Sequence, residues 1–220
     1  RRPFDIKRAN PLGAFKSITQ LPDLGRFMII SFVISLAFFV YPSVWAYFGK
    51  LQFGWGPGMI GLSLGAFGIG IAIVQGLLMR PILNKIGERN AVVLGLSVDV
   101  LAFIMLGFVT NGWIALALTP FTALGSIAGP ALQGIMSRTA ADNQQGELQG
   151  ALTSINAVAT IMAPLLMTQL FFYFTHESAP AYLPGAPFLF SALLTFGAVL
   201  IFIPVRKSIT PRTETTNEVG

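Results

Sequence analysis

Six apolar runs, each long enough to cross a membrane, dominate this sequence. A helix spans the hydrocarbon core of a bilayer with about 20 predominantly apolar residues. The runs lie at residues 27–48, 57–79, 91–110, 113–136, 148–174 and 183–204. Hydrophobic residues make up 54% of the chain and charged residues only 10%, which is unlike the composition of an ordinary soluble domain. The sequence therefore predicts an all-α integral membrane protein with six transmembrane helices.

The basic residues favour one side of this predicted bundle. Six spans return both termini to the same side, and that side holds 13 of the 14 Lys and Arg residues, with Lys50 alone on the other. By the positive-inside rule, we expect both termini to be cytoplasmic. Topology thus explains the net charge of +5, and we expect no nucleic-acid partner.

The chain divides into three segments. Residues 1–26 form a cytoplasmic linker, in which apolar residues recur every third position over 12–21; this spacing suits a short interfacial helix, with a plain linker as the alternative. Residues 27–204 form the six-helix bundle. Residues 205–220 are polar and threonine-rich, so we expect a disordered cytoplasmic tail. The chain does not begin with Met, which suggests a piece of a longer polypeptide.

Known catalytic motifs are absent from the sequence. There is no cysteine and a single histidine, His176, so neither a thiolate nor a multi-histidine metal site can form. The string "GPGMIG" at 56–61 matches the dinucleotide fingerprint, but it opens a membrane helix and follows no strand. There is no Walker motif, zinc-protease motif or nucleophile elbow. We therefore expect no enzyme, no metal site and no cofactor.

Asp99 is the polar residue that most needs an explanation, because it lies in the middle of the third run. A carboxylate at the centre of a membrane helix costs roughly 2.5 to 3.5 kcal/mol on insertion scales. The other runs contain no Lys, Arg or His as a counter-ion. The carboxyl could be protonated, lie in a water-filled cavity, or pair with a group outside this sequence, and all three suit an ion or substrate pathway. A protonated carboxyl with a purely structural hydrogen bond is the alternative.

Neutral polar residues in other runs are candidates for a substrate cavity, although each one singly is more often a contact between helices. Thr153, Asn156 and Thr160 share one face of the fifth helix by their spacing. The candidates are Gln75, Gln133, Thr153, Asn156 and Thr160. Small residues and prolines, which allow close packing or kinks, form a further set, for which ordinary packing is the alternative to a bundle that rocks. This set comprises Gly61, Gly65, Gly125, Gly129, Pro130 and Pro164.

The loop "RPILNKIGER" at 80–89 resembles a degenerate form of the signature loop of the major facilitator superfamily. Aligned on Gly87, the chain offers Lys85 and Arg89 at two basic positions of that motif. It departs from the motif at Arg80 and Asn84, where the family has Gly and Asp. The strings "NPLGAF", "NKIGERNAVVLGLSVDVLAF", "GPALQGIMSR", "QQGELQGALTS" and "APLLMTQLF" are more specific, and they resemble the tetracycline-resistance efflux pumps across nearly the whole chain.

This resemblance implies a 12-helix antiporter, of which the chain would be the C-terminal half, itself a 3+3 inverted repeat. Its partners would be an N-terminal half of the same polypeptide, membrane lipids, the drug and protons. The acid of the ninth helix, tied to proton coupling in that family, maps onto Asp99. A membrane histidine of some members maps onto Ile71. Its absence here argues against a proton relay that uses this histidine.

The function expected from the resemblance is proton-coupled efflux of tetracycline or a related amphipathic drug across the inner (plasma) membrane. The proton gradient would supply the energy, and a divalent metal could accompany the drug as its chelate. The basic residues of loop 80–89 would stabilise one gating state or merely enforce topology. One alternative is a major facilitator transporter of another small molecule. The other is a non-transporting six-helix module that needs a partner half.

Overall fold

The computed structural model describes residues 24–141, 144–179 and 181–204, and every regular element in these ranges is a helix. The predicted interfacial helix and the C-terminal tail lie outside the described residues. The elements, in chain order, are α2 (Leu24–Phe38), α3 (Val40–Phe53), α4 (Pro57–Ile73), the π-helix η2 (Val74–Leu78), α5 (Met79–Phe108), α6 (Gly112–Ala117), α7 (Thr119–Leu124), the 3-10 helix η3 (Gly125–Ile127), α8 (Ala128–Thr139), α9 (Gln145–Thr175) and α10 (Ala186–Phe202).

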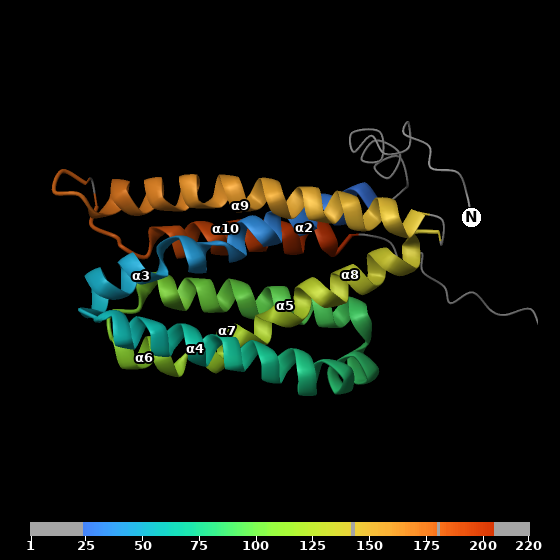
Figure 1. Cartoon of the computed structure of the whole chain (residues 1–220), viewed down its shortest axis with the longest axis horizontal. Coiled ribbons are helices and arrows are strands. Elements are labelled where there is room, and N and C mark those ends of the chain that lie inside the picture. Colours follow the sequence, from blue (N-terminus) through green and yellow to red (C-terminus); the bar gives the residue numbers. More distant parts are fainter. Residues whose placement is uncertain (1–23, 142–143, 180, 205–220) are drawn as a thin grey trace, which may run out of the picture.

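The apolar runs lie on these helices, so the predicted all-α membrane class is confirmed. Among the described residues, four helical stretches are long and apolar enough to cross a membrane, namely Leu24–Phe53, Pro57–Phe108, Gly112–Thr139 and Gln145–Thr175. The 52-residue stretch Pro57–Phe108 folds back on itself, so that α4 and α5 run in opposite directions (Figure 1). Helix α10 is also apolar but has 17 residues. Six membrane crossings remain a prediction.

The prediction of a loop at 80–89 is wrong in one respect, because nearly all of this segment is helical. The reversal falls on Gly87, whose backbone has φ 76° and ψ 162°. A side chain would be strained at this positive φ, so glycine is the residue that fits. Ile82, Leu83 and Ile86 pack against the core, and this burial explains why the preceding segment continues as a helix.

Proline positions account for the interruptions in two of the long helices. A proline has no N–H to donate to the carbonyl four residues earlier. Pro42 therefore leaves the Phe38 carbonyl without its helical donor, and α2 gives way to α3 at Phe39. Pro130 does the same to the Ser126 carbonyl, and residues 125–127 tighten into the 3-10 helix η3. By contrast, α9 continues as one helix through Pro164.

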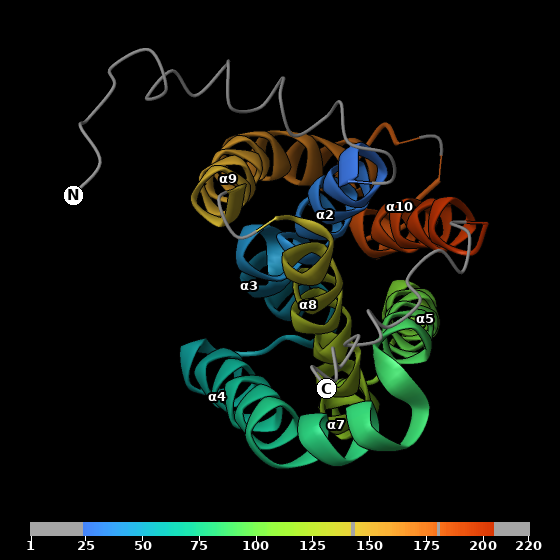
Figure 2. The ribbon, with the colours of Figure 1, turned by 90° about the vertical axis from the view of Figure 1, so that its right-hand side faces the viewer.

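Seen along the bundle, the helices form an open arc (Figure 2). Helices α9 and α4 lie at the two ends of the arc. Helices α3 and α8 lie between them, and α10 and α5 lie on the other side of the bundle. One apolar core contains Leu96, Leu132 and Met136. A second core, rich in aromatic residues, lies toward the end that carries Lys50 and includes Tyr41 and Phe188. These two cores fix the helices that surround the candidate site.

Asn111 caps the helix that begins after the short turn at 109–111. Its side-chain oxygen accepts hydrogen bonds from the backbone N–H groups of Trp113 at 2.8 Å and Ile114 at 3.4 Å. We expect Asn111→Ala to lower the free energy of unfolding in detergent by about 1 kcal/mol. Asn111→Asp is the matched control, since it keeps an acceptor; an equal loss in both variants would contradict the capping role.

Candidate functional site

Asp99 is buried in the C-terminal half of α5 and lies directly against η3, the interruption in the neighbouring helix. Its side chain is 9% exposed. The Oδ1 atom of Asp99 occupies the place that a Cβ on Gly125 would take. Gly125 is the first residue of η3. The glycine therefore provides the space into which the carboxyl fits.

Gly95, one helical turn before Asp99, allows the backbone of α5 to lie close to the backbone of η3 and the start of α8. A Cβ on Gly95 would lie 2.8 Å from the backbone nitrogen of Ala128 and 3.0 Å from the carbonyl oxygen of Gly125. Residues four apart share a helix face, so Gly95 and Asp99 both face the interrupted helix. The close approach of α5 to η3 depends on both glycines.

The Asp99 carboxyl has no cationic partner within the described ranges. The ion pair found there joins Arg138 to Glu88, and no hydrogen bond between described residues reaches the carboxyl. The hydroxyl of Ser126, next to Gly125, is also buried without a described partner. Buried polar groups are normally satisfied by a hydrogen bond or an ordered water. The Asp99 carboxyl and the Ser126 hydroxyl are therefore candidates to bind a small polar species, such as a water molecule or a proton.

A polar groove of about 330 Å³ lies between α2, α8 and α9. It is lined by Ser31, Ile34, Ser35, Gly129, Pro130, Leu132, Gln133, Met136, Gln149, Leu152, Thr153, Ile155 and Asn156. Hydroxyl and amide groups alternate in it with aliphatic side chains, and no lining residue is charged. Its surface is therefore amphipathic and neutral.

Hydrogen bonds across the groove join the helices that line it. The Ser35 hydroxyl donates to Oδ1 of Asn156 at 2.7 Å, which links α2 to α9. Nε2 of Gln133 donates to Oε1 of Gln149 at 3.3 Å, which links α8 to α9. These contacts are between neutral groups, and a bound molecule with hydrogen-bonding groups could replace them.

Three of the five predicted cavity residues meet in this groove, namely Gln133, Thr153 and Asn156. The other two lie elsewhere. Gln75 is exposed on η2, and Thr160 donates its hydroxyl to the carbonyl of Asn156 at 2.8 Å without lining the groove.

Sequence reasoning missed Ser31, Ser35 and Gln149, which also line the groove. Ser31 and Ser35 are four residues apart, so they share one face of the first span. Gln149 precedes Thr153 by one turn and begins the polar stripe of α9. Helical spacing was therefore the signal that could have found all three.

The predicted gating residues of loop 80–89 lie around the Gly87 reversal. Arg80, Asn84 and Lys85 are exposed. Nη2 of Arg89 donates to the carbonyl of Ile203 at 2.7 Å, tying the reversal to the end of α10. Sequence reasoning also missed the Arg138 to Glu88 ion pair, which joins the reversal to the end of α8.

The predicted packing residues differ in outcome. Gly125 lies in tight contact with Asp99, and Pro130 follows η3. A Cβ on Gly61, Gly65 or Gly129 would meet no atom within 4 Å among the described residues. Gly61 and Gly65 lie on an exposed face of α4, and Gly129 borders the groove, so close packing at these three positions is not present in the described structure.

The interrupted helix connects the acid with the groove. Gly125 contacts Asp99, while Gly129, Pro130 and Gln133 from the same helical stretch line the groove. Asp99 itself is not among the lining residues. A change in the charge of Asp99 would therefore alter the groove by moving the segment from η3 to α8.

The fold and the site define a multi-pass helical membrane protein with a buried acid beside a broken helix and a neutral polar groove. Residues 27–219 match the Major Facilitator Superfamily. The chain belongs to this superfamily.

Several tetracycline resistance proteins are similar to the chain. It is 34% identical to the class C protein of Escherichia coli over 171 residues, which cover 78% of this chain and 43% of that protein. It is 32% identical to the class B protein of Escherichia coli over 197 residues, which cover 90% and 47%. The chain is also 25% identical to the Hippocampus abundant transcript 1 protein of Mus musculus. It spans less than half the length of these relatives.

Proposed function

We propose that the chain is the C-terminal half of a transporter in the inner membrane that exports tetracycline, or a related amphipathic drug, in exchange for protons. The family and the tetracycline resistance relatives support transport rather than enzymatic catalysis. The proton gradient supplies the energy, with about 2.3 kcal/mol per charge for each 100 mV of membrane potential. No resident cofactor or metal is part of the proposal, and a divalent ion would enter only as the drug's chelate.

The observation that carries this proposal is the position of Asp99 against Gly125. Proton uptake neutralises the carboxyl and removes the cost of a charge in the bundle. Proton release restores the charge beside the 3-10 helix, and the packing of η3 on α5 must respond. Because α8 continues from η3 into the groove, the two protonation states favour different shapes of the groove.

The groove would provide the drug with a contact surface that is amphipathic and uncharged. Its amide and hydroxyl groups can bind oxygen and nitrogen atoms, while its aliphatic residues contact rings. Groups that match a charge on the drug or on its chelated metal would come from the N-terminal half. Exposed apolar residues on η2 and α9, such as Leu77 and Leu165, form surfaces that this half and the lipids would cover.

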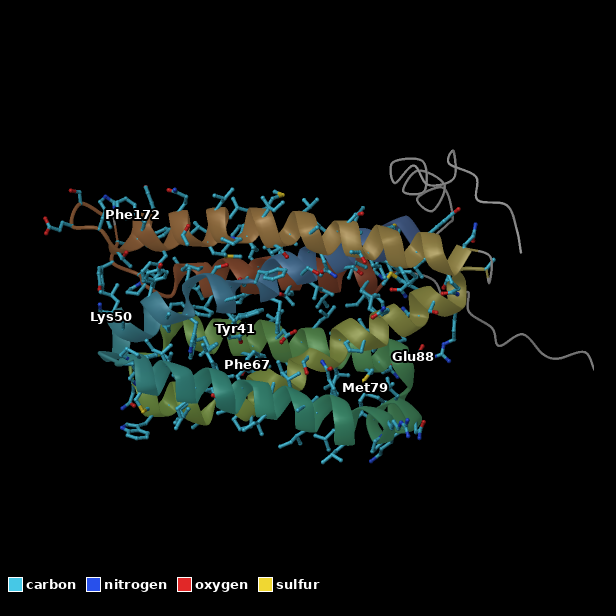
Figure 3. The ribbon with its side chains drawn as sticks, viewed as in Figure 1. Tyr41, Lys50, Phe67, Met79, Glu88 and Phe172 are labelled. Atoms are coloured by element: carbon cyan, nitrogen blue, oxygen red, sulfur yellow. The ribbon has the colours of Figure 1, made fainter. Side chains whose placement is uncertain are left out.

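The distribution of charge supports cytoplasmic termini. Glu88 lies at one end of the bundle and Lys50 at the other (Figure 3). Arg138 pairs with Glu88, and Arg89 is its neighbour in the chain, so both basic residues lie at the Glu88 end. In this proposal that end is cytoplasmic. The contacts of Arg89 and Arg138 would then stabilise the bundle where the cytoplasmic gate closes, with Arg80 and Lys85 facing water.

The test is transport by the transporter that contains this chain together with an N-terminal half, in proteoliposomes with an imposed proton gradient. We expect tetracycline to accumulate against its gradient, and a protonophore to abolish the accumulation. Proton movement driven by a different compound, with none driven by tetracycline, would favour another substrate. An absence of proton-coupled transport for every compound tried would favour the non-transporting module.

Asn156 provides a prediction about drug binding. Asn156→Leu removes the acceptor for Ser35 and one amide from the groove, so we expect tetracycline to bind about tenfold more weakly, the equivalent of ~1.4 kcal/mol. Ser154→Ala is the matched control, because Ser154 is exposed on the same helix and does not line the groove. Titration of tetracycline fluorescence would measure both; equal affinities in the two variants would remove Asn156 from the site.

A further inference from the structure

The hydroxyl groups that line the polar groove donate their hydrogens within the protein. Ser31 donates to a methionine sulfur of α8 at 3.8 Å, and Ser35 donates to a side-chain oxygen of α9 at 2.7 Å. Thr153 donates to the backbone carbonyl one turn earlier on its own helix at 2.8 Å. A hydroxyl carries one hydrogen. These three groups can therefore accept hydrogen bonds from a bound molecule, but they have no hydrogen left to donate.

The side-chain amides are the groups of the groove that still have hydrogens to donate. Oδ1 of Asn156 accepts from Ser35, and Oε1 of Gln149 accepts from Gln133, which keeps one further hydrogen. A side-chain amide nitrogen carries two hydrogens. Among the described residues, no hydrogen bond uses Nδ2 of Asn156 or Nε2 of Gln149. Both residues are exposed and line the groove, so their N–H groups are available to a ligand.

The two amides lie on one face of α9 with aliphatic residues between them. Helix α9 is continuous over both positions (Figure 1). Gln149 and Asn156 are separated by nearly two helical turns, so they share a face, and the rise of the helix places their backbones about 10 Å apart. Leu152 and Ile155 line the groove between them. The groove therefore offers hydrogen-bond donors at two ends and an apolar surface in the middle.

The Gln149 end of the groove lies toward Glu88. Arg138, in the last turn of α8, pairs with Glu88, and α9 begins shortly afterwards at Gln145. Gln149 is one turn into α9, whereas Asn156 lies about two turns further toward the middle of the bundle. A molecule that reaches both amides therefore lies with its long axis along α9.

We propose that Gln149 and Asn156 select an elongated ligand that carries acceptor oxygens at two points about 10 Å apart along one edge. Each amide donates to one of these oxygens, and Leu152 and Ile155 contact the apolar body between them. A row of fused rings with carbonyl and hydroxyl oxygens along one edge, as in tetracycline, is the chemical class that fits. This inference rests on the proposed function, in which the drug occupies the groove.

Protection of single cysteines tests whether one ligand covers both ends. This chain contains no cysteine, so Gln149→Cys and Asn156→Cys each place one thiol in a transporter whose N-terminal half is also made cysteine-free. Tetracycline, at about ten times its dissociation constant for each variant, should slow maleimide labelling of both thiols about tenfold. Ser154→Cys is the control, because Ser154 is exposed on the same helix and outside the groove; tetracycline should not change its labelling.

The donor role of Gln149 is tested by Gln149→Met, which keeps the length of the side chain and removes the amide. We expect tetracycline to bind about tenfold more weakly, the scale of one lost hydrogen bond. Gln145→Met is the matched control. Gln145 lies one turn earlier on α9 and joins Ser137 by hydrogen bonds of 3.0 Å and 2.6 Å, but it does not line the groove. This control loses a contact between the helices and should keep the wild-type affinity.

Protection of Asn156→Cys without protection of Gln149→Cys, or wild-type affinity in Gln149→Met, would overturn the two-point contact. Protection of neither thiol would overturn the placement of the drug in the groove. In each case the proposed function is judged separately, by tetracycline-driven proton flux in the unmodified transporter with both halves. An absence of that flux would overturn the proposed function itself, so the two failures are distinguishable.

Discussion

Replacement of Asp99 by Asn is expected to abolish tetracycline-coupled proton movement while the protein still folds. Asparagine has the shape of aspartate, so it should fill the space beside Gly125 in the same way. It cannot take up or release a proton in the functional range of pH. We expect drug-driven proton flux to drop at least about 100-fold, since the proton-transfer group is removed. The measurement is the pH change inside proteoliposomes on addition of tetracycline.

Two comparisons make the Asp99→Asn result specific. Asp99→Asn should unfold at the wild-type temperature or above, because a buried acid without a described cationic partner is replaced by a neutral amide. Ser154→Ala, on an exposed face of α9, should transport normally. Retention of full proton coupling by Asp99→Asn would show that another group carries the proton.

The second large effect is expected at Gly125, where any side chain collides with Asp99. In Gly125→Ala the new Cβ would overlap Oδ1 of Asp99, with the backbone of α5 held close by Gly95. Overpacking of this kind typically costs about 1–3 kcal/mol of stability. We also expect transport to fail, because the carboxyl can no longer occupy its place. Chemical unfolding in detergent and the flux assay measure the two effects.

A double mutant isolates the contact between these two residues. Asp99→Ala frees the space that the Cβ of Gly125→Ala needs, so the double mutant should recover stability but not transport, and the coupling energy should be about 0.5–3 kcal/mol. Gly129→Ala is the control, because its Cβ would meet no atom within 4 Å. Additive stability losses in the double mutant would contradict the contact between Asp99 and Gly125.

The membrane class could be predicted from the sequence because hydropathy is a local property of each segment. The interruption at Gly125–Ile127 was only partly predictable. Pro130 marks the carbonyl that loses its donor, but the way in which the backbone adjusts depends on the packing of α5. The helical course of residues 80–86 was missed, because its charged residues suggest a loop, whereas Ile82 and Ile86 pack on the core.

The site shows the same division between local and tertiary information. Asp99 stands out in the sequence because a charge in an apolar run is costly. Its contact with Gly125, and its separation from the groove, are tertiary facts that spacing on one helix cannot predict. Thr153 and Asn156 could be grouped by helical spacing, but Thr160 on the same stripe falls outside the groove. Helical spacing could have grouped Ser35 with Ser31, but only the tertiary packing brings Ser35 to Asn156, which is 121 residues away.

Infrared difference spectroscopy of the reconstituted transporter tests most directly whether Asp99 binds and releases the coupling proton. A band of a protonated carboxyl should change on addition of tetracycline and on a change of pH, and it should vanish in Asp99→Asn. A carboxyl spectrum that is the same in wild type and Asp99→Asn, and that responds to neither tetracycline nor pH, would contradict the account.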